Sequence, residues 1–360
     1  MDKLIRNIIG FSLKNRVFIF FLTAILLIAG VFSYIKTPIV AFPDFTNTQI
    51  RIITLWPGRS AQEVERFVTI PIEITMNSVQ RKTNLRSQSM FGLSVVSLVF
   101  EDDVDDMYAR QQITGLLNDI ELPEGATSQL TPPTGPIDEI YRYTLHSPHH
   151  TPAELRTIQD WVIDRNLRTV PGVADVVAFG GPVKTFEVSA NPNLLAKYGL
   201  TAIDVYDAVH KSNVNVGSDV IERAAQAFVV RGIGLLNNVH DIENVIIENV
   251  NGTPILVKNV AVVKESNQPR LGQVQRGKEN DVVEGIVLMR KGIDPGPVLK
   301  ALGEKVKELN EKILPAGVQM KTFYNRQNLI DYCLHTVLHN VAEGMVLVII
   351  IVFLFMLDLR

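Results

Sequence analysis

Three ionisable side chains recur at every fourth position around an apolar run near the C-terminal end: His335, His339 and Glu343. In a helix, this spacing places them on one face. Because ionisable groups inside an apolar helix usually face protein or a water-filled path, the His335–Glu343 stripe could relay protons or bind a metal at a membrane entrance. The alternative places both histidines in the wet interface and leaves only Glu343 constrained, and the sequence favours it for the histidines.

A carboxylate pair, Asp138 and Glu139, follows the proline-rich segment 132–136. Carboxylate oxygens bind divalent cations, so a pair that faced a cleft between two folded units could ligate a metal. Asp138 and Glu139 are therefore candidate metal ligands, and simple surface exposure is the alternative.

The other polar clusters have simpler explanations. His146, His149 and His150 could give zinc, copper or nickel a foothold, but a solvated loop is favoured. The acidic run 101–106 lacks the spaced ligands of a calcium loop, and carboxylates are stabilised in the first turn of a helix anyway. Cys333 is the single cysteine and the methionines are scattered, which excludes a disulfide framework and argues against a soft copper(I) path.

Composition narrows the function classes further. A chain of 360 residues predicts two or three domains. Its 35 basic and 38 acidic side chains give a net charge of −3, so the basic surface typical of nucleic-acid binding is not expected. The sequence contains no phosphate-binding loop, nucleophile elbow or zinc-protease motif. We expect neither an enzyme nor a bound cofactor.

Two apolar runs flank the polar middle of the chain. Residues 17–35 carry no charge and are long enough to cross a hydrocarbon core of about 30 Å. Basic residues precede this run, so the positive-inside rule places residues 1–16 in the cytoplasm. No small-residue cleavage site follows, which favours an uncleaved anchor over a signal peptide. Residues 337–357 form the second predicted transmembrane helix.

With both helices inserted in a bacterial inner membrane, residues 36–336 lie in the periplasm. Arg360 then lies on the cytoplasmic side, a few residues beyond the second helix. We interpret this position of the last residue as the mark of a truncated product or a fragment of a longer chain.

The region after the first apolar run predicts the element order β-α-β-β-α-β. The helix that begins at the capping box Ser60–Glu63 should turn Val64, Phe67, Val68 and Ile72 inward, and Pro71 should kink or break it. Strands are expected at 48–56, at 85–101 in two parts, and up to residue 130, with a second helix after the acidic run. This order is the ferredoxin-like split motif.

The same order recurs in the second half of the chain, interrupted by residues 181–271. Its first helix, which begins at the capping box Thr151–Glu154, should turn Leu155, Ile158, Val162 and Leu167 inward. Strands are expected at 141–145, 173–179, 282–290 and 318–323, with a helix from residue 294. The predicted fold is an α+β membrane protein, in which two transmembrane helices flank two ferredoxin-like units and the second unit carries an α+β insert.

Several segments resemble a known family. These are PGRSAQEVERFVTIPIE (57–73), LRTVPGVADVVAFGG (167–181), LAKYGLTAIDVYDAVHKSN (195–213), LPAGVQMKTFYNRQNLID (314–331) and Pro43-Asp44. Together with the duplicated motif, they resemble the N-terminal part of resistance-nodulation-division (RND) efflux transporters, and the heavy-metal efflux subfamily more than the multidrug one. The resemblance covers the whole chain but only about the first third of the family's length.

The resemblance implies a proton-driven antiporter that exports a metal cation. It implies that 36–135 and 136–180 with 272–330 are two porter subdomains, and that 181–271 is a docking subdomain. Such pumps are homotrimers that work with a periplasmic adaptor and an outer-membrane channel. Asp138 or Glu139 lies near an acidic metal ligand of some zinc-type members, and Glu343 resembles an acidic residue common in the second membrane helix.

The family's proton-relay aspartates and most of its metal ligands belong to later segments, so the 360 residues alone should not transport.

Two other interpretations stay open. Multidrug efflux is the first alternative, although only 7% of the residues are aromatic. The second is a membrane-anchored periplasmic interaction module, for which Glu343 would have no use. Scattered methionines favour zinc, cobalt, nickel or cadmium over copper or silver.

Overall fold

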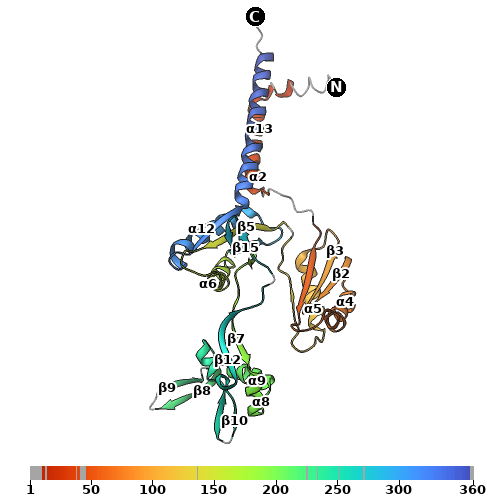
Figure 1. Ribbon diagram of the computed structural model, residues 1–360. Helices are drawn as coiled ribbons and strands as arrows, with labels where there is room; N and C mark the ends of the chain where they lie inside the picture. Colours follow the sequence, from red (N-terminus) through yellow and green to blue (C-terminus); the bar gives the residue numbers. More distant parts are fainter. Residues whose placement is uncertain are drawn as a thin grey trace.

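The computed structural model describes residues 10–356 except 13, 38, 41–45, 136, 224–225, 233, 251 and 271. Most of the predicted cytoplasmic segment, the Pro43-Asp44 motif and the last four residues therefore lie outside the described part of the chain. Two αβ units, an insert and two long helices make up the described structure (Figure 1).

The first unit (residues 49–130) is one antiparallel sheet in the order β2-β3-β1-β4, covered by helices. Its fourth strand lies beside its first, which is the ferredoxin-like arrangement that the sequence predicts. The elements are β1 (Gln49–Leu55), α3 (Ala61–Val64), the π-helix η1 (Glu65–Thr69), α4 (Ile70–Met76), β2 (Lys82–Met90), β3 (Leu93–Phe100), α5 (Asp106–Asn118) and β4 (Thr127–Leu130).

The first helix of this unit is continuous through Pro71. The π turn Glu65–Thr69 precedes Pro71, which therefore lies in the first turn of α4. A proline is tolerated there because the first backbone N–H groups of a helix have no acceptor within that helix. Every fourth residue is buried as a result: Val64, Val68, Ile72 and Met76. The predicted inward position of Phe67 and the predicted break at Pro71 are both wrong. Phe67 is 49% exposed, and its ring meets Trp56 edge-on.

The second unit (residues 139–179 and 283–325) repeats the first, with the strand order β16-β5-β15-β6. Its first helix also contains a π turn and also buries every fourth residue: Leu155, Gln159, Ile163 and Leu167. Ile158 and Val162, predicted to point inward, are only half-buried because the π turn shifts the helix face. The elements are β5 (Glu139–His146), α6 (Pro152–Ile158), η2 (Gln159–Ile163), α7 (Asp164–Leu167), β6 (Val173–Phe179), β15 (Val283–Met289), α12 (Pro295–Glu308), η3 (Leu309–Ile313) and β16 (Gln319–Asn325).

The insert leaves the second unit after β6 and has its own apolar core. The exit is a tight turn at Gly180 and Gly181, both with positive φ, where a Cβ on Gly180 would meet the carbonyl oxygen of Val282. Its elements are β7 (Lys184–Ala190), α8 (Pro192–Tyr198), α9 (Ala202–Ser212), β8 (Val216–Arg223), β9 (Gln226–Gly232), α10 (Val239–Glu243), β10 (Ile246–Val250), β11 (Thr253–Leu256), α11 (Val257–Val260) and β12 (Ala261–Asn267). The antiparallel strands β7 and β12 connect it to the second unit, followed by the hairpin β13 (Gln275–Arg276) and β14 (Glu279–Asn280).

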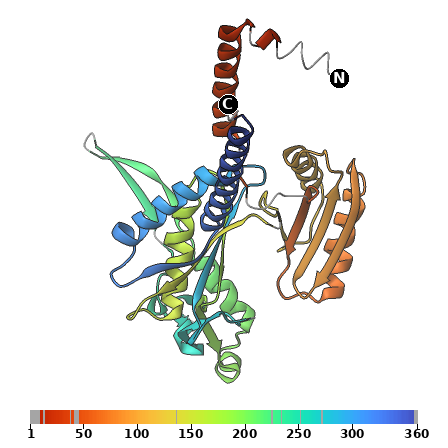
Figure 2. The same ribbon diagram turned by 90° about the horizontal axis from the view of Figure 1, so that it is seen from above.

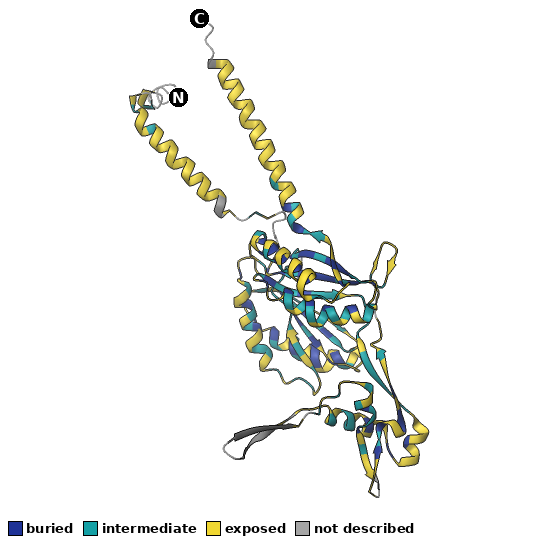
Figure 3. Ribbon diagram, turned by 90° about the vertical axis from the view of Figure 1, so that its left-hand side faces the viewer, coloured by how far each residue is buried: buried dark blue, intermediate teal, exposed yellow. Residues whose placement is uncertain are grey.

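Two long helices, α2 (Arg16–Lys36) and α13 (Arg326–Met356), are apolar and long enough to cross a membrane. Their apolar stretches are exposed, and both helices leave the units on the side opposite the insert (Figure 3). Seen from above, the two units stand beside each other (Figure 2). Helix α13 begins before residue 337, the predicted start of the second membrane helix, because its first turns pack inside the second unit: Ile330 is part of that core.

Candidate functional site

Asp138 is held in the link between the two units. It is only 4% exposed, and its carboxylate accepts a hydrogen bond from the backbone N–H of Gly135. Its own carbonyl accepts from the N–H of Met289 at the end of β15, at 2.8 Å. The Asp138 side chain thus closes a turn, and its backbone attaches that turn to the second sheet.

Glu139 points elsewhere, since neighbouring residues of an extended chain alternate in direction. Its carboxylate forms an ion pair with Arg142, whose guanidinium also lies 3.7 Å from Glu284. The hydrogen bond that Arg142 donates to the Glu139 carboxylate raises the pKa of Arg142. The structure therefore does not bring Asp138 and Glu139 together as one pair of ligands, and a metal-binding role for either residue stays a prediction.

The His335–Glu343 stripe lies on one face of α13, as its spacing predicts. The rings of His335 and His339 stack with centroids 6.1 Å apart, and His339 Nε2 lies 3.1 Å from Glu343 Oε1. At about 1.5 Å of rise per residue, Glu343 is roughly 20 Å beyond Ile330, where the helix leaves the second unit. The three side chains thus form a continuous polar track on one face of α13 that ends where its apolar stretch begins.

The acidic run 101–106 and the histidines of the loop after β5 make local structural contacts. Asp105 caps α5 by accepting from the N–H of Tyr108 at 3.0 Å, and Asp106 pairs with Arg110 at 2.6 Å. His150 Nδ1 is 2.8 Å from Ser147 Oγ in the loop after β5. Over the described part of the chain, no three His, Cys, Asp or Glu side chains gather closely enough to hold a metal ion.

Arg326 is a buried residue that sequence reasoning missed. It is 1% exposed at the first position of α13, and its Nη1 donates to the carbonyl oxygen of Ile137 at 2.8 Å. The start of α13 is thereby joined to the link between the two units. From sequence, an arginine before an apolar helix resembles an ordinary flanking basic residue, so no local signal pointed to its burial.

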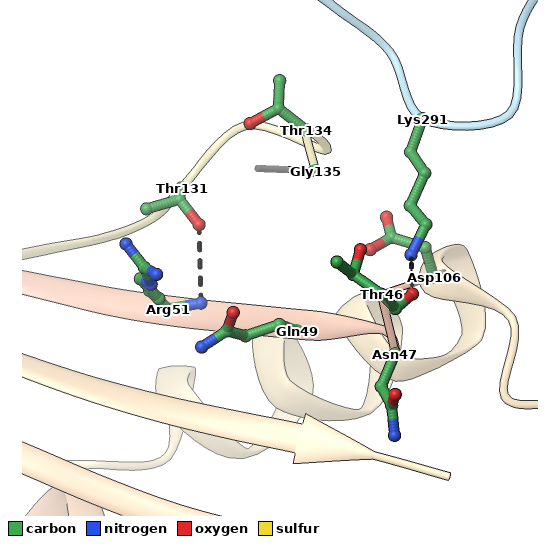
Figure 4. Close-up of a pocket in the computed structure, with 9 residues that line it drawn as sticks. All are labelled: Thr46, Asn47, Gln49, Arg51, Asp106, Thr131, Thr134, Gly135 and Lys291. Atoms are coloured by element: carbon green, nitrogen blue, oxygen red, sulfur yellow. Dashed lines mark hydrogen bonds between the residues drawn. The ribbon is translucent and has the colours of Figure 1, made fainter. Parts of the chain in front are cut away.

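A polar cavity of about 160 Å³ lies between the units (Figure 4). Strand β1 supplies Gln49 and Arg51, and Lys291 reaches in from the loop after β15 of the second unit. Lys291 Nζ donates to the carbonyl oxygen of Thr46 at 2.7 Å, and its backbone N–H donates to Pro133 at 3.0 Å. The remaining lining residues are Thr46, Asn47, Asp106, Thr131, Thr134 and Gly135. Sequence reasoning identified none of these as a shared site, because Lys291 and Thr46 are 245 positions apart.

Two ferredoxin-like units and two long apolar helices define the architecture of the chain, and comparison with known proteins identifies its family. The profile of the AcrB/AcrD/AcrF family matches residues 8–360, so the chain belongs to this family of efflux transporters. It is 38% identical to protein HelA of Legionella pneumophila over 99% of this chain and 35% of that protein.

Two other relatives are named for metal resistance or cation efflux. The cobalt-zinc-cadmium resistance protein CzcA of Cupriavidus metallidurans is 37% identical over 98% of this chain and 34% of its own length. The cation efflux system protein CusA of Escherichia coli is 34% identical over 99% of this chain and 34% of its own. A crystal structure of a heavy metal efflux pump superposes with a TM-score of 0.85 at 34% identity, covering 95% of this chain and 35% of the pump. The chain thus spans about a third of the length of its relatives.

Proposed function

We propose that this chain is the N-terminal part of a proton-driven permease that exports divalent heavy-metal cations. The observation that carries the proposal is the alignment with CzcA and CusA over 98% and 99% of this chain, which takes in both units, the insert and both long helices. The permease is a secondary transporter and not an enzyme: the metal cation is its cargo, the proton motive force its energy source, and it needs no bound cofactor.

In this proposal the two units are porter subdomains, within residues 36–135 and within 136–180 and 272–330. The insert, within 181–271, is the docking subdomain. Residues 1–16 are cytoplasmic, α2 and α13 lie in the lipid of the inner membrane, and residues 36–336 are periplasmic. The position of the insert on the side opposite the two helices supports this orientation, because it then lies farthest from the inner membrane (Figure 3).

The proposed assembly is a homotrimer with a periplasmic adaptor and an outer-membrane channel. An exposed apolar stripe on the first helix of the first unit supports self-association: Phe67, Ile70 and Ile74 recur at helical spacing and point away from the core. Two αβ units that each have their own apolar core can also rock against each other, as alternating access requires.

Within the proposed transport cycle, Glu343 and His339 are the candidate proton-carrying pair. Their contact at 3.1 Å joins two groups that can exchange a proton in an apolar helix. For Glu139, metal binding would require release of Arg142, and for Asp138 it would require opening of the Gly135 turn. The scattered methionines favour zinc, cobalt, nickel or cadmium as cargo.

The test is metal resistance in a strain from which the gene has been deleted. The strain is complemented with the 360-residue chain or with the coding region extended downstream, and growth is scored in zinc, cobalt, cadmium, nickel, copper and silver. We expect only the extended form to restore resistance, and to the first four metals. If the extended form restores tolerance to dyes or detergents instead, multidrug efflux replaces the proposal.

A further inference from the structure

We propose that His335 and His339 on α13 form a binding site for a divalent transition-metal ion of the zinc or nickel type. The site goes beyond the proposed function, because it is inferred from these two side chains and not from export. Imidazoles four positions apart lie on one face of a helix, and zinc-protease helices bind their metal through histidines at the same spacing. The sequence favoured two unrelated histidines in a wet interface, and the structure brings them together.

The two histidine rings already lie against each other. Their centroids are 6.1 Å apart, and their planes are inclined by only 14°. Zinc–nitrogen bonds are about 2.0–2.1 Å long, so the two ligating nitrogens of a tetrahedral site are about 3.4 Å apart. Both residues are exposed, so rotation about their side-chain bonds can bring two nitrogens to that separation without moving the helix backbone.

Glu343 supplies the support that metal-binding histidines usually have. Its Oε1 lies 3.1 Å from Nε2 of His339. A histidine that binds a metal through one ring nitrogen commonly donates the N–H of the other to a carboxylate, which fixes the ring and its tautomer. Held in this way, His339 offers Nδ1 to a metal. Within the described part of the chain, His335 stacks on His339 and makes no hydrogen bond, so its ring nitrogens are available as well.

The charges along this part of α13 favour a cation. From residue 327 to residue 356 the helix carries two charged side chains besides its histidines, Asp331 and Glu343, and both are acidic. They lie one turn before and one turn after the histidine pair. Gln327 donates to the Asp331 carboxylate at 2.7 Å, so Asp331 contributes its charge without being needed as a ligand. No basic side chain on this stretch of helix opposes a bound dication.

The pair lies where α13 has left the second unit and its apolar stretch has not yet begun. At about 1.5 Å of rise per residue, His335 and His339 are roughly 8 and 14 Å beyond Ile330, which belongs to the core of that unit. The side chain of His339 is 62% exposed, so water can fill the coordination positions that two imidazoles leave open. Imidazole nitrogens suit zinc, nickel and copper(II), whereas magnesium and calcium prefer oxygen ligands.

The test is calorimetric titration of the full 360-residue chain in detergent, purified without a histidine tag and freed of metal with a chelator. Zinc, nickel, magnesium and calcium are titrated at pH 7.5 in a buffer that does not bind metal ions. We expect saturable binding of zinc and nickel and none of magnesium or calcium.

Four variants locate the site. His335→Gln and His339→Gln should each remove saturable zinc binding, because a single imidazole remains. Glu343→Gln keeps both ligands and should weaken binding by a smaller factor, about tenfold. His339→Gln combined with Asn340→His keeps the number of histidines but turns one of them away from His335, and should also remove binding. Glutamine forms helices well and these positions are exposed, so the single variants should fold.

The controls are the other histidines and the thiol near the pair. His149→Gln and His150→Gln after β5, His240→Gln on α10 and Cys333→Ser should all leave zinc binding unchanged. The proposal is overturned if zinc does not bind in a saturable way, if magnesium binds equally well, or if the Asn340→His double variant keeps wild-type affinity. Loss of binding in Cys333→Ser would assign the ion to the thiol and would also refute it. Binding is measured without transport, so a negative result would leave the proposed export standing.

Discussion

Tyr143 and Gln159 put a polar pair into the core of the second unit, where the first unit has apolar side chains. Gln159 takes the place in its buried stripe that Val68 takes in the first unit. The Tyr143 hydroxyl donates to Gln159 Oε1 at 2.9 Å, and burial raises the pKa of Tyr143, so this donor stays protonated. Gly285 pairs with Tyr143 across the sheet, and only glycine fits there because the Tyr143 ring occupies the space that a Cβ would need.

Tyr143→Phe should destabilise the second unit by about 1–3 kcal/mol, because a buried amide then loses its partner. The Gln159 Nε2 atom already has no partner among the described residues, so the whole amide would be unsatisfied. Denaturant unfolding in detergent, followed by the fluorescence of nearby Trp161, measures the change. Adding Gln159→Met should recover most of the loss. A double variant no more stable than Tyr143→Phe would contradict this account.

Glu154→Gln should lower stability at neutral pH but not in acid. Hydrogen bonds from the Thr151 backbone and hydroxyl lower the pKa of Glu154 below its usual 4.5, so the carboxylate stabilises the fold above that pH. This contribution declines below pH 4.5 and is gone once pH falls through the lowered folded-state pKa. The unfolding midpoints of wild type and variant, measured from pH 7 downward, should therefore converge. A gap that stays constant with pH would point to a steric effect.

At the scale of elements, the π turns set which helix face is buried. Both units bury every fourth residue of their first helix, whereas an undistorted α-helix advances by 3.6 residues per turn. A π turn contains one residue more than an α-helical turn, so positions four apart stay on the helix face that packs against the sheet. This is why Phe67 and Val162 do not lie in the core although ordinary helical spacing places them there.

Ile163→Ala should cost about 2–5 kcal/mol, because Ile163 is fully buried in the second core. Val162→Ala, one position earlier, should cost clearly less because Val162 is only half-buried. The two variants change neighbouring residues of the same π turn, so each is the other's control in denaturant unfolding. If Val162→Ala proved the more damaging, the helix would have the regular α phase.

The elements themselves could largely be predicted from the sequence, because their signals are local. The capping boxes at Ser60 and Thr151 mark helix starts, and both are formed in the structure. The π turns could not be predicted, since nothing in the residue types distinguishes Val68 from Phe67 as the buried partner. Burial of Arg326 and the hydrogen bond from Lys291 to Thr46 depend on tertiary packing of distant segments, which spacing does not encode.

At the scale of the whole molecule, the proposed orientation places Cys333 on the periplasmic side, where its labelling reports the membrane topology. It is the single cysteine, it is exposed, and it lies just beyond the point where α13 leaves the second unit. A membrane-impermeant maleimide should therefore label it in intact spheroplasts. In a Cys333→Ser background, Lys14→Cys on the cytoplasmic side should be labelled only after lysis. The reverse pattern would invert the topology.

Metal export is measured most directly as the metal content of loaded cells over time. Cells that lack their own exporters are loaded with zinc, washed and sampled for cell-associated zinc. With the coding region extended downstream, zinc should fall rapidly, and an uncoupler that collapses the proton gradient should stop the fall. The 360-residue chain alone should leave the content unchanged. Zinc retained equally with and without the extended form, or lost regardless of the uncoupler, would contradict a proton-driven metal exporter.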